Sequence, residues 1–266
     1  MDIVFIGLIF VLMNALKLLK KYIIDSQIFV SMMGTFFAIF FMLEQNTFRW
    51  PTVALLFITY FSGYLYTKYQ NTKHFPTILV LNCFAGIISA ILIILNHNEI
   101  RLLKWFFIIL LGLLYNSSFL ETYIRKIPLL KVFYVGLIWG LMNCWLTLPE
   151  FSFPIFLISF LFITALVLPF DIRDMKSDTV MTFPKIIGVQ NTKYLAYFLI
   201  FAATILSVFY LEFTFSLSFF VSSIFTFILI YFSENSNKDS YFSLWVELCS
   251  ALPFLFLILF EKLYLY

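Results

Sequence analysis

Three aspartates follow one another at helical spacing in the segment Asp171-Ile-Arg-Asp-Met-Lys-Ser-Asp178, within a chain that is otherwise strongly apolar. If this segment is helical, spacings of three and four residues place Asp171, Asp174 and Asp178 on one face. Like charges on one stripe repel each other, so the stripe is stable only if it is well hydrated or binds cations. A divalent-cation site and a solvated acidic loop are therefore the two interpretations.

The composition is that of a membrane protein. Of 266 residues, 63% are hydrophobic and only 12% are charged, and the formal net charge is +3. These values lie far from those of soluble domains, and so small a basic excess does not suggest a nucleic-acid partner. Cys83, Cys144 and Cys249 each lie inside an apolar run, and the only histidines are His74 and His97. Neither a disulfide framework nor a zinc site is expected.

Apolar runs of roughly 16 to 22 residues predict nine transmembrane helices and leave no room for a soluble domain. The expected fold class is all-α, a polytopic membrane protein with one domain over residues 1–266. Prolines and short polar segments end most of the runs. The predicted spans are 28–43, 50–67, 76–95, 102–118, 130–148, 153–170, 193–211, 214–232 and 242–261.

Residues 1–21 are expected to form an interfacial helix. The apolar stretch from residue 3 to 16 reaches only about 21 Å at about 1.5 Å per residue, which is shorter than the hydrocarbon core of a bilayer. No basic region precedes it and no small-residue cleavage site follows it, so a removable signal peptide is not expected. Lys17, Lys20 and Lys21 come next and would hold this end at a cytoplasmic surface.

The distribution of basic residues predicts the orientation. With nine spans and a cytoplasmic N-terminus, only Arg49, Arg101, Lys104 and Lys262 of the 17 Lys and Arg residues fall outside. This asymmetry is the positive-inside pattern and predicts a multi-pass protein of the cell inner (cytoplasmic) membrane. The loop 171–192 is then cytoplasmic, on the same side as the loops after the second and fourth spans. Long loops in compact folds usually carry function.

The aspartate segment continues into Thr182-Phe-Pro184 and Ile187-Gly188. This pattern resembles the second aspartate-rich motif of the UbiA superfamily of intramembrane prenyltransferases, with its trailing Thr-x-Pro and Gly element. The nine predicted spans and the segment from Lys126 to Lys131, which leads into the fifth span, are also similar to that family. The resemblance extends from about residue 20 to residue 261 and is most specific over 171–188.

The resemblance implies a helical bundle around a central cavity, in which a prenyl diphosphate gives its polyprenyl group to a lipophilic acceptor. The implied metal is Mg²⁺, bound here by Asp171, Asp174 and Asp178. Mg²⁺ takes few carboxylates and completes its shell with phosphate oxygens and water. It would neutralise the diphosphate as that group leaves.

Basic residues on the neighbouring loops would contact the diphosphate by charge and hydrogen bonds. The candidates are Lys68, Arg125 and Lys131. The apolar wall of the bundle would receive the isoprenoid tail, and its phenylalanine faces would stabilise an allylic cation.

The first aspartate-rich motif of the superfamily, of the type Asn-x-x-x-Asp-x-x-x-Asp at the end of the second span, is absent. In its place stands Tyr60-Phe-Ser-Gly-Tyr-Leu-Tyr-Thr-Lys-Tyr-Gln-Asn71, and no Asp or Glu occurs between Glu44 and Glu99. We therefore expect a divergent member, in which Lys68 substitutes its positive charge for one metal ion.

Three further polar residues are candidates for an acceptor pocket. Glu247 lies in the ninth predicted span, where ionisable groups are costly and often functional. It is expected to accept a proton, to pair with a loop lysine or to extend toward the interface. Tyr115 and Asn116 end the fourth span, where an acceptor pocket and interhelical hydrogen bonding explain them equally well.

The function expected from the sequence is a Mg²⁺-dependent membrane prenyltransferase that moves a polyprenyl group from its diphosphate to an unidentified aromatic or lipid acceptor. One alternative is a non-catalytic relative that binds isoprenoid lipids. Another is an isoprenoid cyclase, which would use the same cavity without a second substrate. The expected partners are the prenyl diphosphate, the lipophilic acceptor and the lipid bilayer.

Overall fold

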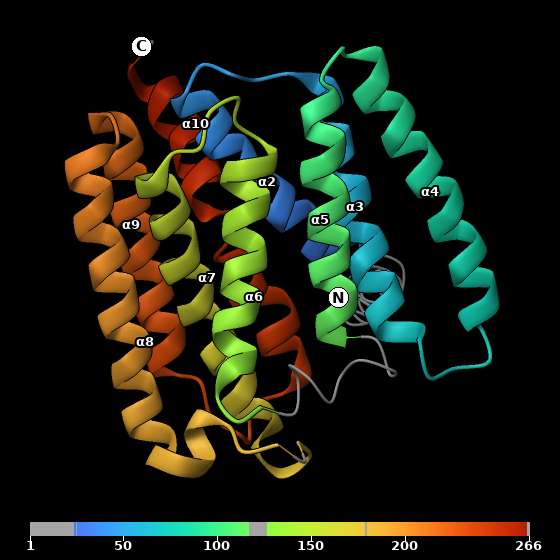
Figure 1. Ribbon diagram of the computed structural model, residues 1–266. Coiled ribbons are helices and arrows are strands. Elements are labelled where there is room, and N and C mark those ends of the chain that lie inside the picture. Colours follow the sequence, from blue (N-terminus) through green and yellow to red (C-terminus); the bar gives the residue numbers. More distant parts are fainter. Residues whose placement is uncertain (1–23, 25, 117–126, 179, 265–266) are drawn as a thin grey trace, which may run out of the picture.

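The computed structural model describes residue 24 and residues 26–116, 127–178 and 180–264, and its regular elements are all helical (Figure 1). No strand occurs within these ranges. The fold class predicted from the apolar runs is therefore confirmed. The interfacial helix expected over residues 1–21 lies outside the described residues.

The helices follow the predicted apolar runs closely, and most boundaries differ by a few residues. α8 begins about ten residues before its predicted span. The predicted ninth span is divided into a π-helix and α10. The elements are α2 (Ile28–Glu44), α3 (Trp50–Tyr69), α4 (Phe75–Leu95), α5 (Glu99–Asn116), α6 (Leu130–Gly140), the π-helix η2 (Leu141–Leu146), α7 (Phe153–Arg173), the 3₁₀ turn η3 (Asp174–Lys176), α8 (Phe183–Tyr210), α9 (Phe213–Tyr231), the π-helix η4 (Tyr241–Val246) and α10 (Leu252–Tyr264).

Helix length and hydropathy support a multi-pass membrane protein. Within the described residues, four helical segments are long and apolar enough to cross a bilayer: Phe75–Leu95, Phe153–Lys176, Phe183–Tyr210 and Phe213–Tyr231. The segments Ile28–Glu44 and Leu130–Leu146 are apolar but shorter. The total of nine spans stays a prediction.

Proline explains where four of the helices begin. Pro51, Pro76, Pro154 and Pro184 each stand at the first or second position of α3, α4, α7 and α8. The fixed φ of proline suits the first turn of a helix, and its missing N–H would have no intrahelical acceptor there. The chain breaks expected at Pro51, Pro76 and Pro154 are therefore helix starts, whereas Pro128 and Pro149 lie in the connections before α6 and α7.

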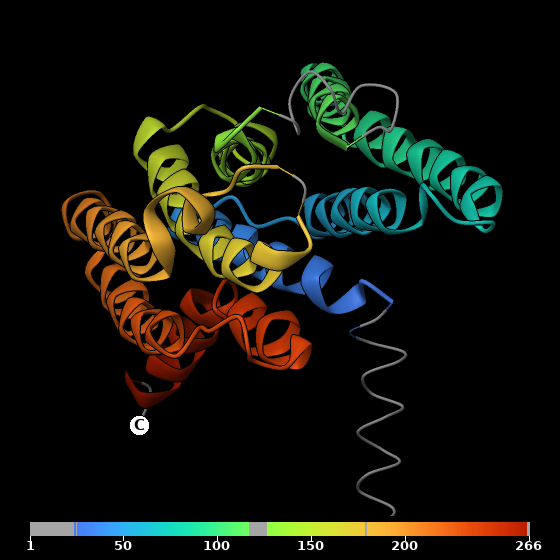
Figure 2. The same cartoon turned by 90° about the horizontal axis from the view of Figure 1, so that it is seen from below.

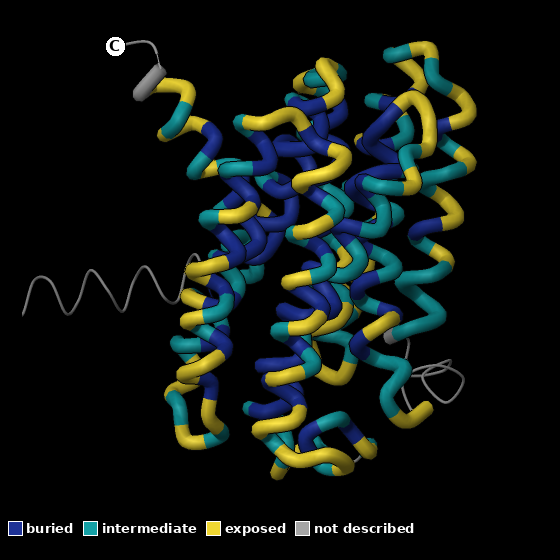
Figure 3. Tube along the Cα trace, turned by 90° about the vertical axis from the view of Figure 1, so that its left-hand side faces the viewer, coloured by how far each residue is buried: buried dark blue, intermediate teal, exposed yellow. Residues whose placement is uncertain are grey.

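α7 lies in the interior of the bundle and packs against α6 and α8 (Figure 2). Aromatic rings join it to α2 and α9, because the ring centroids of Phe37 and Phe162 lie 5.5 Å apart and those of Phe162 and Phe219 lie 5.0 Å apart. α4 lies at the periphery of the bundle, and only 11% of the residues in its most apolar stretch are buried. Figure 3 shows buried residues gathered on the inward faces of the helices and exposed residues on the outward faces.

Two glycines bring α6 into close contact with α7. A Cβ atom on Gly136 would lie 2.1 Å from Thr164 Oγ1 and 2.9 Å from the carbonyl oxygen of Phe160. A Cβ atom on Gly140 would lie 3.0 Å from the ring of Phe156. Small residues four apart allow helix backbones to approach closely. Because Lys131 lies in the first turn of α6, this contact sets its position along α7.

The connections that follow α3, α7 and α9 lie at the same end of the bundle as the first turn of α6 (Figure 1). The alternating helices thus bring together loops that are far apart in the sequence. The loop after the second predicted span and the loop 171–192 were expected on the same side of the bundle, and this arrangement agrees with that prediction. Most of the loop after the fourth span lies outside the described residues.

Candidate active site

The C-terminus of α7 carries the aspartate segment, but the three carboxylates do not share one helical face. The α-helix ends at Arg173 and a 3₁₀ turn follows, so Asp178 lies beyond both elements. The side-chain amide of Asn235 donates to the carbonyl oxygens of Ile172 (3.2 Å) and Arg173 (2.9 Å). Ile172 and Arg173 are the last two residues of α7, where helix carbonyls lose their i+4 donors, so Asn235 caps the helix and favours its end at this point. The expectation of one acidic helical stripe is therefore wrong.

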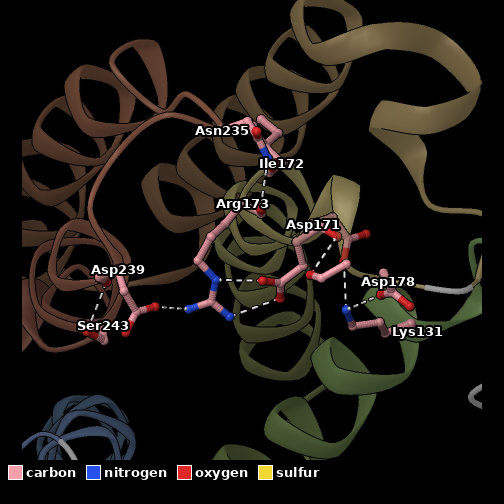
Figure 4. Close-up of polar contacts among 10 residues, drawn as sticks. Lys131, Asp171, Ile172, Arg173, Asp178, Asn235, Asp239 and Ser243 are labelled. Atoms are coloured by element: carbon pink, nitrogen blue, oxygen red, sulfur yellow. Dashed lines mark hydrogen bonds and ion pairs between the residues drawn. The ribbon is translucent and has the colours of Figure 1, made fainter.

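Two of the aspartates meet at one ammonium group. Lys131 Nζ lies 3.0 Å from Asp171 Oδ1 and 3.3 Å from Asp178 Oδ2 (Figure 4). The Asp171 side chain is only 1% exposed, and the Lys131 side chain is 20% exposed. A carboxylate this deeply buried needs a charged partner, and Lys131 provides it. Lys131 therefore lies at the acidic cluster, as its predicted role at the diphosphate requires.

Asp174 faces a different cation. Its two oxygens accept hydrogen bonds from Arg173 Nε (2.8 Å) and from a terminal Arg173 nitrogen (2.9 Å), and the other terminal nitrogen lies 2.9 Å from Asp239 Oδ1 (Figure 4). The guanidinium also stacks over Phe170, with 5.1 Å between the carbon Cζ and the ring centroid. The fork of Arg173 thus joins the end of α7 to the segment just before η4.

The segment after the aspartates is fixed to the same cluster. Lys185 Nζ donates to the carbonyl oxygen of Asp178, and the backbone N–H of Leu129 donates to the carbonyl oxygen of Met181 at 3.3 Å. Gly188 takes φ 81° and ψ 162° and interrupts α8. This combination is open essentially only to glycine. The Gly of the predicted motif therefore makes a bend that returns the chain to the bundle.

The carboxylates fit the predicted Mg²⁺ in part. Within the described residues, no three His, Cys, Asp or Glu side chains are grouped so that they could hold a metal ion. Asp171 and Asp178 nevertheless share one cation position, and Mg²⁺ in phosphate-binding sites commonly takes only one or two carboxylates. The pair fits such a site, whereas Asp174 would first have to leave Arg173.

The remaining predicted site residues are placed less completely. Arg125 lies outside the described residues, and so does the side chain of Asn116. Lys68 is exposed in the last turn of α3, with its ammonium 5.9 Å from the ring centroid of Tyr69. The ring of Tyr115 stacks on Tyr134 with centroids 5.3 Å apart.

Tyrosines of α3 occupy the inner side of the bundle where a first aspartate motif would lie. Tyr60 Oη donates to Asn143 Oδ1 (3.0 Å), and the Asn143 amide donates to Ser159 Oγ (2.8 Å). One turn further on, Tyr64 lies close enough to Glu247 and Tyr115 to interact electrostatically with both. Through Tyr64, α3 lies close to Glu247, but α3 itself carries no carboxylate.

A separate apolar groove of about 560 Å³ lies between α2, α3 and α10. It contains none of the predicted site residues, and the hydroxyl of Thr35 on its wall is already bonded to the Ser31 carbonyl at 2.7 Å. Its volume falls within the range of about 300–1,000 Å³ typical of small-ligand sites. The lining residues are Met32, Thr35, Phe36, Ile39, Leu43, Phe48, Trp50, Val53, Phe57 and Phe254.

The sequence did not predict the roles of three residues in this cluster. Arg173 is the cation that binds Asp174, Asp239 is the second carboxylate bound by Arg173, and Asn235 caps the end of α7. The polar run from Ser233 to Asp239, between two apolar spans, was the available signal.

The fold is similar to that of a solved digeranylgeranylglyceryl phosphate synthase of membranes. The TM-score is 0.57, with 17% sequence identity, over 91% of this chain and 97% of that chain. No protein-family model and no curated protein sequence matches the chain. At this identity the likeness shows the fold alone, a helical bundle similar to that of the synthase.

Proposed function

We propose that this protein is a membrane transferase that binds a prenyl diphosphate at the loop end of its bundle and moves the polyprenyl group to an aromatic or lipid acceptor. The observation that carries the proposal is the shared position of Asp171, Asp178 and Lys131 in a UbiA-like fold. These groups offer both a cation site and a phosphate-binding ammonium within hydrogen-bonding distance of one another.

Asp171 and Asp178 would hold Mg²⁺, joined by Asp174 if its carboxylate leaves Arg173. Mg²⁺ when bound would neutralise the departing diphosphate. Lys131 would then turn its ammonium from the carboxylates to a phosphate oxygen, since all three N–H donors rotate freely about the end of its chain. Arg173 keeps the cluster joined to the segment before η4 through Asp239, at 2.9 Å.

We assign the isoprenoid tail to the apolar groove between α2, α3 and α10. Its lining side chains are apolar or aromatic except Thr35, whose hydroxyl has its partner. An apolar chain there loses water or lipid contact without leaving a polar group unsatisfied.

A non-catalytic protein that binds isoprenoid lipids is the second candidate. The ion pair of Lys131 with two carboxylates favours it, because such a pair satisfies the cluster without any metal. The tyrosines of α3 in place of a first aspartate motif favour it too.

Release of diphosphate tests the two candidates. Purified full-length protein is incubated with radiolabelled geranylgeranyl diphosphate, Mg²⁺ and a membrane lipid extract. For a transferase we expect a labelled lipid product, and Asp178→Asn should lower diphosphate release by about 100-fold. Glu150→Gln, which changes an exposed carboxylate at the other end of the bundle, should have no effect.

The other outcomes identify the other activities. Saturable binding of the label without release, indifferent to Mg²⁺ and to Asp178, would establish a lipid-binding protein. A labelled hydrocarbon formed without the lipid extract would establish a cyclase.

A further inference from the structure

Glu247 lies at an irregular point of the last apolar segment. The π-helix η4 ends at Val246, and the turn that follows is tight, since the N–H groups of Cys249 and Ser250 donate to the carbonyl oxygens of Val246 and Glu247, each at 3.2 Å. α10 begins only at Leu252. Irregular backbone at membrane depth is tolerated where it is buried in protein or lines a polar cavity, and π-helical turns are frequent at functional sites.

The side chain of Glu247 is half-buried and faces charged and phenolic groups of several elements. It lies within electrostatic range of Lys68 and Tyr64 on α3, of Arg173 at the end of α7, and of Asp239 before η4. Among the described residues, none donates a hydrogen bond to its carboxylate, and none forms an ion pair with it. Pairing with a loop lysine, one of the roles expected from the sequence, is therefore not what the described residues show.

The other acidic side chains of the described chain at this end of the bundle are all engaged by a cation. Lys131 binds two of them, Arg173 binds two more, and Lys193 binds the last at 2.6 Å. These carboxylates are Asp171, Asp178, Asp174, Asp239 and Glu234. Within this part of the structure, Glu247 is the carboxylate left to act as a base.

We infer that Glu247 is the catalytic base that accepts the proton of the acceptor, and that the acceptor is a lipophilic molecule with a hydroxyl group. The inference rests on the proposed function. As C1 of the prenyl group leaves the diphosphate oxygen, its C–O bond breaks and the electron pair stays with diphosphate. The acceptor oxygen forms a new bond to C1, and its proton passes to a Glu247 oxygen. Tyr64, which lies within electrostatic range of Glu247, would orient the acceptor hydroxyl.

Two variants and two lipid extracts test this inference in full-length protein. Glu247→Gln keeps the size of the side chain but cannot take a proton, so transfer should fall by about 100-fold or more. Glu247→Asp should retain part of the activity. Binding of radiolabelled geranylgeranyl diphosphate, measured without the extract, should stay within about threefold in both variants, because the base acts on the acceptor. Glu150→Gln is the matched control, since it removes an exposed carboxylate.

The extract identifies the chemical class of the acceptor. Acetylation of all hydroxyls in the lipid extract should abolish product formation by the unchanged protein, and deacetylation should restore it. Transfer at the normal rate by Glu247→Gln, or prenylation of the acetylated extract, would overturn the inference while leaving the proposed function intact. Loss of diphosphate binding in both variants would also overturn it, because Glu247 would then serve the diphosphate or the fold. If the unchanged protein forms no product from either extract, the proposed function itself fails, and the inference with it.

Discussion

At the scale of single residues, Lys131 is the group on which the candidate site depends. It satisfies the charge of Asp171, whose side chain is 1% exposed, and it also reaches Asp178. A buried ion pair contributes little net stability, but removal of one partner leaves an uncompensated buried charge. The ammonium of Lys131 therefore compensates the buried charge of Asp171, and under the proposed function it would also bind a phosphate oxygen.

Replacement of Lys131 by Met should destabilise the protein by about 3 kcal/mol, because Asp171 would remain buried without its cation. The free energy of unfolding, measured by denaturant titration in detergent, checks this value. The double variant Lys131→Met with Asp171→Asn should recover most of the loss, since it removes both charges. Lys131→Arg keeps the charge and serves as the control. If Lys131→Met and the unchanged protein had equal free energies of unfolding, the ion pair would contribute nothing to stability.

At the scale of elements, glycines decide how α6, α7 and α8 present the site. Gly136 and Gly140 allow α6 to contact α7 closely, and Gly188 turns α8 at φ 81°. Each glycine acts by a different physical means, the first two by lack of volume and the third by backbone freedom. The geometry of the site therefore depends on how these helices pack, because a shift of α6 relative to α7 would move Lys131 away from Asp171.

Gly136→Ala tests the close approach of α6 and α7. The new methyl group would lie 2.1 Å from Thr164 Oγ1 and 2.9 Å from a backbone oxygen, so the helices must separate. We expect a loss of about 1–3 kcal/mol in unfolding free energy and weaker binding of geranylgeranyl diphosphate. Gly112→Ala is the control, because a Cβ atom there meets nothing within 4 Å. A stability equal to that of the control would contradict the close packing.

Gly188→Ala tests the bend in α8. The backbone conformation of φ 81° and ψ 162° is strained for any side chain, although a Cβ atom there meets no neighbour within 4 Å. The expected loss is about 1–3 kcal/mol from backbone strain alone. Gly63→Ala in α3 also has open space, and there the change should be neutral or stabilising. Thermal unfolding of the two variants side by side separates strain from steric contact.

The sequence predicts elements of this fold better than it predicts their contacts. The span predicted over 28–43 agrees with α2 to within one residue, because the length of an apolar run and the positions of prolines are local signals. The predicted ninth span was interrupted near Glu247, and hydropathy carries no signal for a π-helix that remains apolar. The bond of Asn235 to the end of α7 spans 62 residues, so it depends on how α9 returns to α7.

The same distinction holds in the candidate site. Asp171, Asp178 and Lys131 were predicted from their residue types and motif, and the structure brings them together. That Lys131 rather than water would neutralise the aspartates does not follow from spacing, because it depends on the depth at which α6 packs. Asp174 was expected on the same stripe, but a change from α-helix to 3₁₀ turn within one residue directs it to Arg173.

At the scale of the whole molecule, the bundle is similar in fold to the solved synthase although the two sequences are only 17% identical. Such a fold tolerates wide sequence change because lipid-facing positions need only be apolar. α4 shows this most clearly, since few of its residues are buried and its sequence is almost uniformly apolar. The loop end is different, because there each charge requires a partner.

If the site takes a prenyl diphosphate as proposed, the orientation of the bundle decides from which compartment that substrate comes, since a multiply charged diphosphate does not cross hydrocarbon. The excess of basic residues at the loop end predicts that this end faces the cytoplasm. In a chain whose Cys83, Cys144 and Cys249 are replaced by Ala, a cysteine is introduced by Ser177→Cys or by Glu150→Cys, both at exposed positions at opposite ends. A membrane-impermeant maleimide added to intact cells should label only the Glu150→Cys chain. Ser177→Cys should react after the membrane is permeabilised. The reverse labelling would place the aspartate cluster outside, where a cytoplasmic prenyl diphosphate could not reach it.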